Sequence, residues 1–89
     1  MSDDRRNGEI ADGVRSILAE VGARADLTDV QDHDSLLASN VVDSVAMVNL
    51  VTALEARFGI MIDDTELTPE HFDTVDAIVA LVSRKTRTV

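Results

Sequence analysis

Apolar residues recur at helical spacing in the first quarter of this 89-residue chain. From residue 9 to residue 21 they recur every three or four positions, with one adjacent pair, which places them on one face of a helix. These residues are Ile10, Val14, Ile17, Leu18 and Val21. We therefore expect a helix over residues 9–21 that stops at Gly22. Residues 1–8 are polar and charged, and we expect a disordered N-terminal segment there.

Residues 23–43 show no helical period and are rich in Asp, Ser and Asn. We interpret this stretch as a long ordered loop. The residues expected to pin it to the core are Leu27, Val30, Leu36 and Leu37. A loop of this length is uncommon in a compact domain and is often functional.

A second helix is predicted to start at Asp43 or Ser44, since both are favourable N-cap residues. It runs to Phe58 and ends at Gly59, where a left-handed residue would satisfy the last carbonyl groups. Its core-facing stripe consists of Met47, Leu50, Val51, Leu54 and Phe58.

Two further helices follow. Thr68 and Pro69 predict the start of a short helix that reaches Phe72, with the proline at the first helical position. Asp73 or Thr74 then caps a last helix. Its buried face is Val75, Ile78, Val79 and Val82. No segment alternates with period two, so no strand is predicted. The fold class is therefore an all-α four-helix bundle with three longer helices and one short one. We expect this domain to span residues 9–84 and a C-terminal tail to follow at residues 85–89.

The second helix is more apolar than one buried face requires. Val45 and Val48 lie outside the core-facing arc, on the same side as the residues Asn49, Thr52 and Ala56. In so small a bundle some of these valines should face water near Ser44. An exposed apolar patch suggests a surface for a partner or ligand, although isolated surface valines are also ordinary.

Charge narrows the classes of partner. The chain has a net charge of −9 and no cysteine, and residues 25–83 contain twelve acidic residues against one basic residue, Arg57. Such a surface repels nucleic acid and anionic membranes and attracts basic protein surfaces, or it serves solubility alone. Without a long apolar run or a signal-like start, and without disulfides, we expect a cytoplasmic protein, monomeric, with no nucleic-acid or membrane partner.

Ser44 lies where the loop meets the second helix. A serine in this position is usually a helix cap. The free amides and the dipole of a helix N-terminus also favour a phosphate, so an exposed Ser44 suits modification with a phosphate ester. The neighbouring Asp43 would oppose the added negative charge. These residues indicate a modification site without identifying the modification.

Few groups in the chain could perform catalysis. His33 lies between two aspartates of the loop and is more consistent with a solvated turn, and His71 is more consistent with a surface residue. No oxyanion-hole glycines accompany Ser44, which argues against a Ser–His–Asp triad. The acidic residues 63–66 lack the spacing of a calcium-binding EF-hand. We therefore expect no catalytic residue, no metal site and no enzyme activity.

Three sequence blocks occur in register between residues 10 and 82. The first is Val42-Asp43-Ser44-Val45, the second is residues 50–62 (L-V-x-A-L-E-x-x-F-G-I-x-I), and the third is residues 72–75 (F-D-T-V). Together they resemble the phosphopantetheine-binding acyl and peptidyl carrier protein family. The blocks are similar to its Asp-Ser-Leu modification motif, its second helix with the following turn, and the entry to its last helix.

The resemblance implies a bundle of the acyl carrier protein type, with 4′-phosphopantetheine from coenzyme A attached to Ser44. A separate, magnesium-dependent phosphopantetheinyl transferase would attach this arm, and its thiol would hold acyl or aminoacyl groups as thioesters for delivery to partner enzymes. A thiol on the cofactor agrees with the absence of cysteine. The partner-binding residues that the resemblance implies are Asp43, Val45, Val48, Thr52, Glu55 and Ile62.

Some positions depart from the family pattern. Asn40 stands where glycine is common, and asparagine accepts a positive φ more readily than most residues. Fatty-acid carriers usually display several acids along the second helix, whereas here Ala46 and Asn49 occupy two such positions and Glu55 remains. The chain therefore looks most similar to stand-alone aminoacyl or D-alanyl carriers, loaded by an acyl- or aminoacyl-activating ligase and serving downstream acceptor enzymes.

Two alternatives from other classes stay open. An unmodified, carrier-like helical adaptor would dock basic protein partners through the acidic surface, and replacing Ser44 would leave its binding intact. An independent hydrolase using Ser44 would show turnover without any cofactor.

Overall fold

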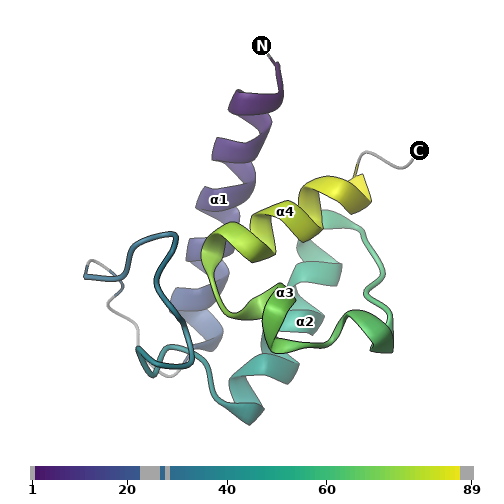
Figure 1. The fold of residues 1–89 in the computed structure, drawn as a ribbon. Coiled ribbons are helices and arrows are strands. Elements are labelled where there is room, and N and C mark those ends of the chain that lie inside the picture. Colours follow the sequence, from purple (N-terminus) through teal and green to yellow (C-terminus); the bar gives the residue numbers. More distant parts are fainter. Residues whose placement is uncertain (1, 23–26, 28, 87–89) are drawn as a thin grey trace.

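The computed structural model of the chain describes residues 2–22, 27 and 29–86 (Figure 1). Within these residues it contains four α-helices and one 3-10 helix, and no strand. The elements are α1 (Ser2–Val21), α2 (Ser44–Phe58), the 3-10 helix η1 (Asp64–Glu66), α3 (Pro69–Phe72) and α4 (Val75–Thr86). The predicted all-α architecture of three longer helices and one short one is confirmed.

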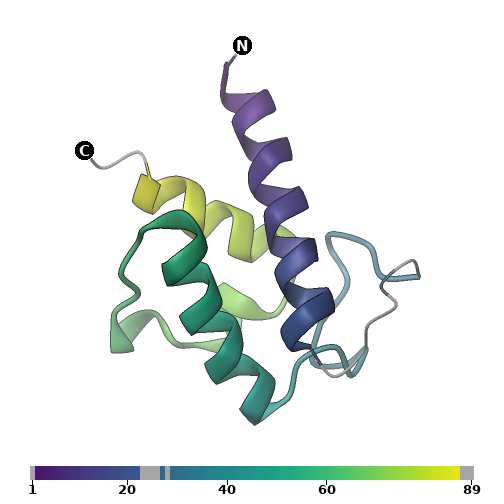
Figure 2. The same cartoon turned by 180° about the vertical axis from the view of Figure 1, so that it is seen from behind.

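Helix α1 packs against both α2 and α4, and the short α3 packs against α4 (Figures 1 and 2). The side chains at the centre of the core are almost wholly aliphatic. The fully buried ones are Val14, Leu18, Leu36, Val41, Leu50, Leu54, Phe72, Val75, Ile78, Leu81 and Val82. Helices α1 and α2 approach closely at Gly13, where an added Cβ would come within 2.9 Å of the Phe58 ring.

No helix among the described residues has the length and apolar character needed to cross a bilayer.

Helix α1 is longer than the sequence pattern predicted. It begins at Ser2, so residues 2–8 are helical in the structure where a disordered segment was expected. Gly8 and Glu9 are exposed and Ile10 is the first buried residue of the described side chains. Figure 1 shows this end of α1 projecting beyond the rest of the bundle. Because the first turns project from the bundle, no apolar period marks them in the sequence.

The predicted capping residues are confirmed at α2. The Asp43 carboxylate accepts a hydrogen bond from the Ala46 amide at 2.8 Å, and Gly59 is left-handed with φ 63° at the other end. Its N–H donates to the Glu55 carbonyl group. The sequence therefore predicted both ends of α2 correctly.

The last two helices also begin as predicted. Thr68 precedes Pro69, the first residue of α3. The Thr74 hydroxyl accepts a hydrogen bond from the Ala77 amide at 2.9 Å, so Thr74 rather than Asp73 caps α4. The predicted buried face of α4, from Val75 to Val82, lies in the core.

Helix α4 runs to Thr86, so residues 85 and 86 are helical where a tail was expected, and residues 87–89 lie outside the described residues. The Lys85 ammonium group lies 2.7 Å from Glu66 Oε1, and an Arg84 guanidinium nitrogen lies 3.7 Å from Glu66 Oε2. These ion pairs tie the last turn of α4 to η1, which explains why the helix continues to Thr86.

The 3-10 helix η1 was not predicted from the sequence, where its acidic residues were considered only as a possible calcium-binding loop. The Asp63 amide donates to Glu66 Oε1 at 3.0 Å, which is one half of a capping box. An aspartate followed three residues later by a glutamate was the local signal for this turn.

The loop before α2 meets the core much as expected. Val30 and Leu36 are buried and Leu27 is half-buried against the core, whereas residues 23–26 and 28 lie outside the described part. Leu37 was also expected to pin the loop, but its side chain is 42% exposed. Leu36 already points inward, and the next residue in this turn points away; Val41 and Val42 fill the core instead.

Candidate functional site

Ser44 is the first residue of α2 and is exposed to solvent. Its hydroxyl group makes no hydrogen bond with any described residue. The start of α2 lies at one end of the bundle, directly after the long loop (Figures 1 and 2). A reacting group at this position is reachable from solvent and sits at the positive end of the helix dipole, which favours a phosphate ester.

Asp43 precedes Ser44 in an extended conformation (φ −124°, ψ −171°) and is also exposed. Its carboxylate oxygen Oδ1 accepts from the Ala46 amide, and its carbonyl group accepts from the Met47 amide at 2.8 Å. The second oxygen, Oδ2, bonds with no described residue. The carboxylate therefore fixes the start of α2 with one oxygen and presents the other to solvent.

The residues just before Asp43 are held by their own backbone. The Val41 and Val42 amides both donate to the Leu36 carbonyl group, at 2.9 Å and 3.2 Å, and both valine side chains are buried. Asn40 takes the left-handed conformation, with φ 60°, in agreement with its place at a position suited to glycine. This closed turn fixes the direction in which the chain enters the site.

The same loop is tied to the end of the bundle that carries α3 and α4. The Ser35 hydroxyl donates to Asp73 Oδ1 at 2.7 Å, and the Leu36 amide donates to the Asp73 carbonyl group. Farther up the loop, the Arg15 guanidinium donates to Asp32 Oδ1 at 2.6 Å and to the Val30 carbonyl group at 2.8 Å. Ser44 thus begins a helix whose preceding loop is anchored to both α1 and the α3–α4 junction.

The outer side of α2 is apolar, as predicted. Val45 is 72% exposed and Val48 is 65% exposed, and Thr52 is exposed on the same helix. The Thr52 hydroxyl donates to the Val48 carbonyl group at 3.1 Å, which satisfies it within the helix. An apolar strip therefore extends along α2 from Ser44.

Glu55 and Ile62 differ from the other residues expected at a partner surface. Both are half-buried, and the Ile62 amide donates to Glu55 Oε2 at 2.9 Å. The carboxylate closes the turn after α2, so its first role is structural. Met61 lies between buried Ile60 and half-buried Ile62 and is 81% exposed. Met61 was not among the surface residues predicted from the sequence, although its place between two isoleucines was a usable signal.

Neither histidine supports a catalytic arrangement around Ser44. His33 Nε2 lies 3.8 Å from Asp34 Oδ1 on the exposed loop. His71 is half-buried, and its Nδ1 lies 2.9 Å from the Thr68 hydroxyl. Within the described residues no group of three or more His, Cys, Asp or Glu side chains is placed to hold a metal ion.

Comparison with known proteins adds the chemistry that the geometry leaves open. Residues 12–82 match the family described as "Phosphopantetheine attachment site". The chain is 34% identical over 77 residues to the acyl carrier protein of Thermotoga maritima, which covers 86% of this chain and 91% of that protein.

Two further relatives are named as carriers of other groups. The aminoacyl carrier protein 1 of Bradyrhizobium diazoefficiens is 33% identical over 69 residues, which cover 78% of this chain and 72% of that protein. The D-alanyl carrier protein of Streptococcus suis is 34% identical over 55 residues, which cover 62% of this chain and 68% of that protein. Identity to the three relatives is nearly equal.

The helical bundle with an exposed serine at the start of α2 therefore belongs to the class of cofactor-bearing carriers. The chain is a member of the phosphopantetheine attachment family. It is a carrier protein, and its prosthetic group is covalently attached 4′-phosphopantetheine. Carriers of this family interact with enzymes that modify them and enzymes that handle acyl groups, and they do not themselves catalyse the reactions. The alternative of an unmodified adaptor is not favoured.

Proposed function

We propose that Ser44 is the attachment residue, and that the chain carries acyl or aminoacyl groups to partner enzymes without being an enzyme itself. The observation that supports this most strongly is the exposed, unbonded hydroxyl of Ser44 at the first residue of α2, directly after Asp43. Ser16 is the other exposed serine among the described side chains, and it lies in the middle of α1. Among the serines whose side chains the structure describes, Ser44 alone combines exposure with a helix N-terminus.

The transfer needs a separate phosphopantetheinyl transferase. The Ser44 Oγ attacks the phosphorus atom of coenzyme A that bears the pantetheine, so that an O–P bond forms as the phosphoanhydride bond breaks. Adenosine 3′,5′-bisphosphate leaves, and the hydroxyl proton passes to the transferase. The arm supplies a thiol that holds cargo as a thioester. The positive end of the α2 dipole stabilises the phosphodiester on Ser44.

The surface that partners contact runs along α2 from Ser44. Val45, Val48 and Thr52 supply its exposed strip, and Asp43 presents one free carboxylate oxygen to a basic residue of the transferase. Glu55 closes its far end, about 16 Å from Ser44 along the axis at the rise of an α-helix, and Ile62 lies beside it through the bond of its amide to the Glu55 carboxylate. Apolar side chains that lie at a surface in this way favour protein docking.

The cargo that we propose is an aminoacyl or related acyl group, loaded by an activating ligase and passed to an acceptor enzyme. Between Ser44 and Phe58 the only acidic residue is Glu55, and its carboxylate is already bonded to the Ile62 amide. A ligase that recognises an apolar helix therefore fits α2 better than an enzyme that needs a row of acids. The monomeric state and cytoplasmic location stay predictions from the sequence.

Labelling with a fluorescent coenzyme A analogue and a broad-specificity transferase tests the attachment. Wild type and Ser16→Ala should be labelled at the same rate, and Ser44→Ala should not be labelled. Label on Ser44→Ala would place the arm elsewhere.

Loading of the holo-protein tests the cargo separately. We expect ATP-dependent transfer of an amino acid or short acyl acid by an activating ligase, and little transfer by a malonyl transferase that loads a fatty-acid carrier in parallel. Equal loading by the malonyl transferase would contradict the proposed cargo and leave the attachment residue unaffected.

A further inference from the structure

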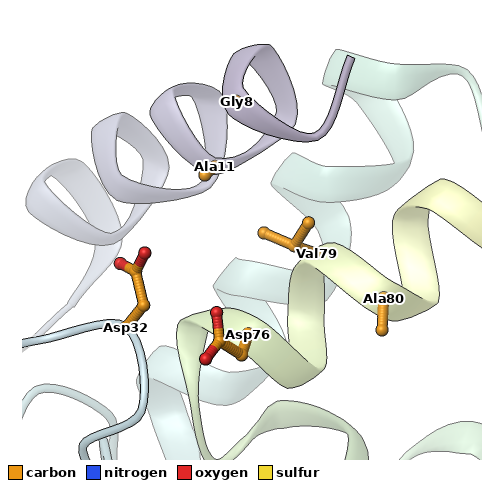
Figure 3. A pocket seen from close by; sticks show the side chains of 6 residues that line it. All are labelled: Gly8, Ala11, Asp32, Asp76, Val79 and Ala80. Carbon is orange, nitrogen blue, oxygen red and sulfur yellow. The ribbon is translucent and has the colours of Figure 1, made fainter. Parts of the chain in front are cut away.

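A groove separates α1 from α4 at the end where α1 projects from the bundle (Figure 3). Its volume is about 360 Å³. The lining residues come from three parts of the chain: Gly8, Ala11, Asp32, Asp76, Val79 and Ala80. None of them belongs to the surface proposed along α2.

The groove combines two carboxylates with small apolar side chains. Asp32 and Asp76 lie on the same side of it, and the Asp76 amide donates to the Asp32 carbonyl group at 3.0 Å, which fixes their spacing (Figure 3). Asp32 Oδ1 binds the Arg15 guanidinium, but Asp32 Oδ2 and both Asp76 carboxylate oxygens bond with no described residue. None of the described residues that line the groove is basic.

We propose that this groove is a second docking surface, for an arginine of a basic segment in a protein partner. Charge complementarity supports this occupant, because the chain has a net charge of −9 and two of its carboxylates, Asp32 and Asp76, line the groove. The contact between Arg15 and Asp32 shows that a guanidinium already fits one of them. Ala11 and Val79 offer apolar surface to the aliphatic stem of an arginine, whose head would reach Asp76.

The position of the groove gives it a use that the α2 surface cannot have. Helix α4 is nearer to the viewer in Figure 1, and α2 is nearer in Figure 2, which is seen from behind. A partner held between α1 and α4 therefore lies away from the outer side of α2 and leaves Ser44 accessible. The carrier could stay bound to one protein while a second one acts at Ser44.

Amide chemical shifts of the uniformly 15N-labelled full chain test the proposal, with the probe peptide acetyl-Gly-Arg-Gly-amide. Its neutral isostere, with citrulline in place of arginine, is the control probe. We expect saturable shifts at the amides of Ala11, Asp32, Asp76 and Ala80 with the arginine peptide and none with the citrulline peptide. Equal shifts with both probes, or shifts spread over the acidic residues of η1 and α3, would overturn the proposal.

Matched variants test the residues. Asp76→Asn should weaken binding of the arginine peptide by roughly two- to five-fold, as expected for an exposed ion pair, whereas Asp64→Asn removes an exposed charge on η1 and should leave affinity unchanged. Gly8→Leu places a large side chain at a residue that lines the groove and should obstruct it. The helix can accept this change, because an added Cβ at Gly8 meets nothing within 4 Å. Ala56→Leu, on the outer side of α2, should have no effect. Equal weakening by Asp64→Asn, or unchanged binding in both groove variants, would contradict a defined site.

Discussion

The Ser35 hydroxyl donates a hydrogen bond to Asp73 Oδ1 at 2.7 Å, across 38 positions of sequence. The Leu37 amide donates to the same oxygen at 3.3 Å. Asp73, in the junction between α3 and α4, therefore holds the loop that leads to Ser44. The loop has little regular structure of its own, so its shape near the modification site depends on such single contacts.

Replacing Asp73 should loosen this loop. We expect Asp73→Ala to lower the free energy of unfolding by about 1–2 kcal/mol, because the Ser35 hydroxyl and the Leu37 amide lose a charged acceptor. Urea-induced unfolding measures the change. Asp64→Ala removes an exposed aspartate from η1 and should alter stability by less than about 0.5 kcal/mol. Equal effects of the two changes would show that the contact to Ser35 contributes nothing.

Two substitutions at Asp43 separate its two roles. Asp43→Ala removes the N-cap of α2 and should cost about 1 kcal/mol of stability, whereas Asp43→Asn retains a good cap. If the transferase also recognises the free carboxylate oxygen, both variants should be modified more slowly than wild type. Unfolding curves and initial transfer rates give the two quantities. A wild-type transfer rate in Asp43→Asn would show that capping is the only role of Asp43.

Asn40 provides a test of backbone strain in the turn before the site. Its φ of 60° is accessible to asparagine and glycine but unfavourable for other residues. Asn40→Ala should therefore destabilise the fold by about 1 kcal/mol, and Asn40→Gly should be close to neutral. Thermal unfolding followed by circular dichroism compares them. The reverse order of stability would mean that this turn is not left-handed in solution.

Glu66 should make stability depend on acidity. The hydrogen bond from Lys85, followed by that from the Asp63 amide and the nearby charges of Lys85 and Arg84, holds the pKa of Glu66 below its ordinary value of 4.5. A lowered folded-state pKa stabilises the protein fully above the unfolded-state value, and the stabilisation is lost as the pH falls through the folded-state pKa. The stability advantage of wild type over Glu66→Gln should thus be complete near neutral pH and shrink in acid.

Urea unfolding at a series of pH values from about 7 to about 3 follows this loss. Lys85→Met removes the largest cause of the lowered pKa of Glu66. The difference in unfolding free energy between Lys85→Met and the double variant Lys85→Met/Glu66→Gln should therefore change less with pH than the difference between wild type and Glu66→Gln. Parallel pH profiles for wild type and Glu66→Gln would contradict the account of this ion pair.

The parts of the fold that were predicted correctly depend on local chemistry. Asp43 and Gly59 fix the ends of α2 through capping, and Pro69 and Thr74 start the last two helices. Exposure of Val45 and Val48 followed from helical geometry, since a helix in a small bundle cannot bury all its sides. In each case, residues within a few positions of one another were sufficient for a correct prediction.

The features that were not predicted from the sequence are of two kinds. Some depend on contacts between residues that are distant in the chain, and the others are helical turns that lack an apolar period. The turns of α1 before Ile10 have no apolar period in the sequence to mark them. The pairs Arg15–Asp32 and Ser35–Asp73 join positions far apart in the chain, and the groove between α1 and α4 follows from how those helices pack. Leu37 was assigned to the core because the sequence does not show which of two adjacent leucines points inward.

Intact-mass analysis of the protein purified from cells that co-express a phosphopantetheinyl transferase tests the central claim most directly. The account predicts a single phosphopantetheinyl increment on wild type, located by peptide fragmentation on Ser44, and an unmodified mass for Ser44→Ala that keeps the wild-type helical circular dichroism spectrum. An increment on folded Ser44→Ala, or an unmodified wild type where a control carrier is fully modified, would contradict it.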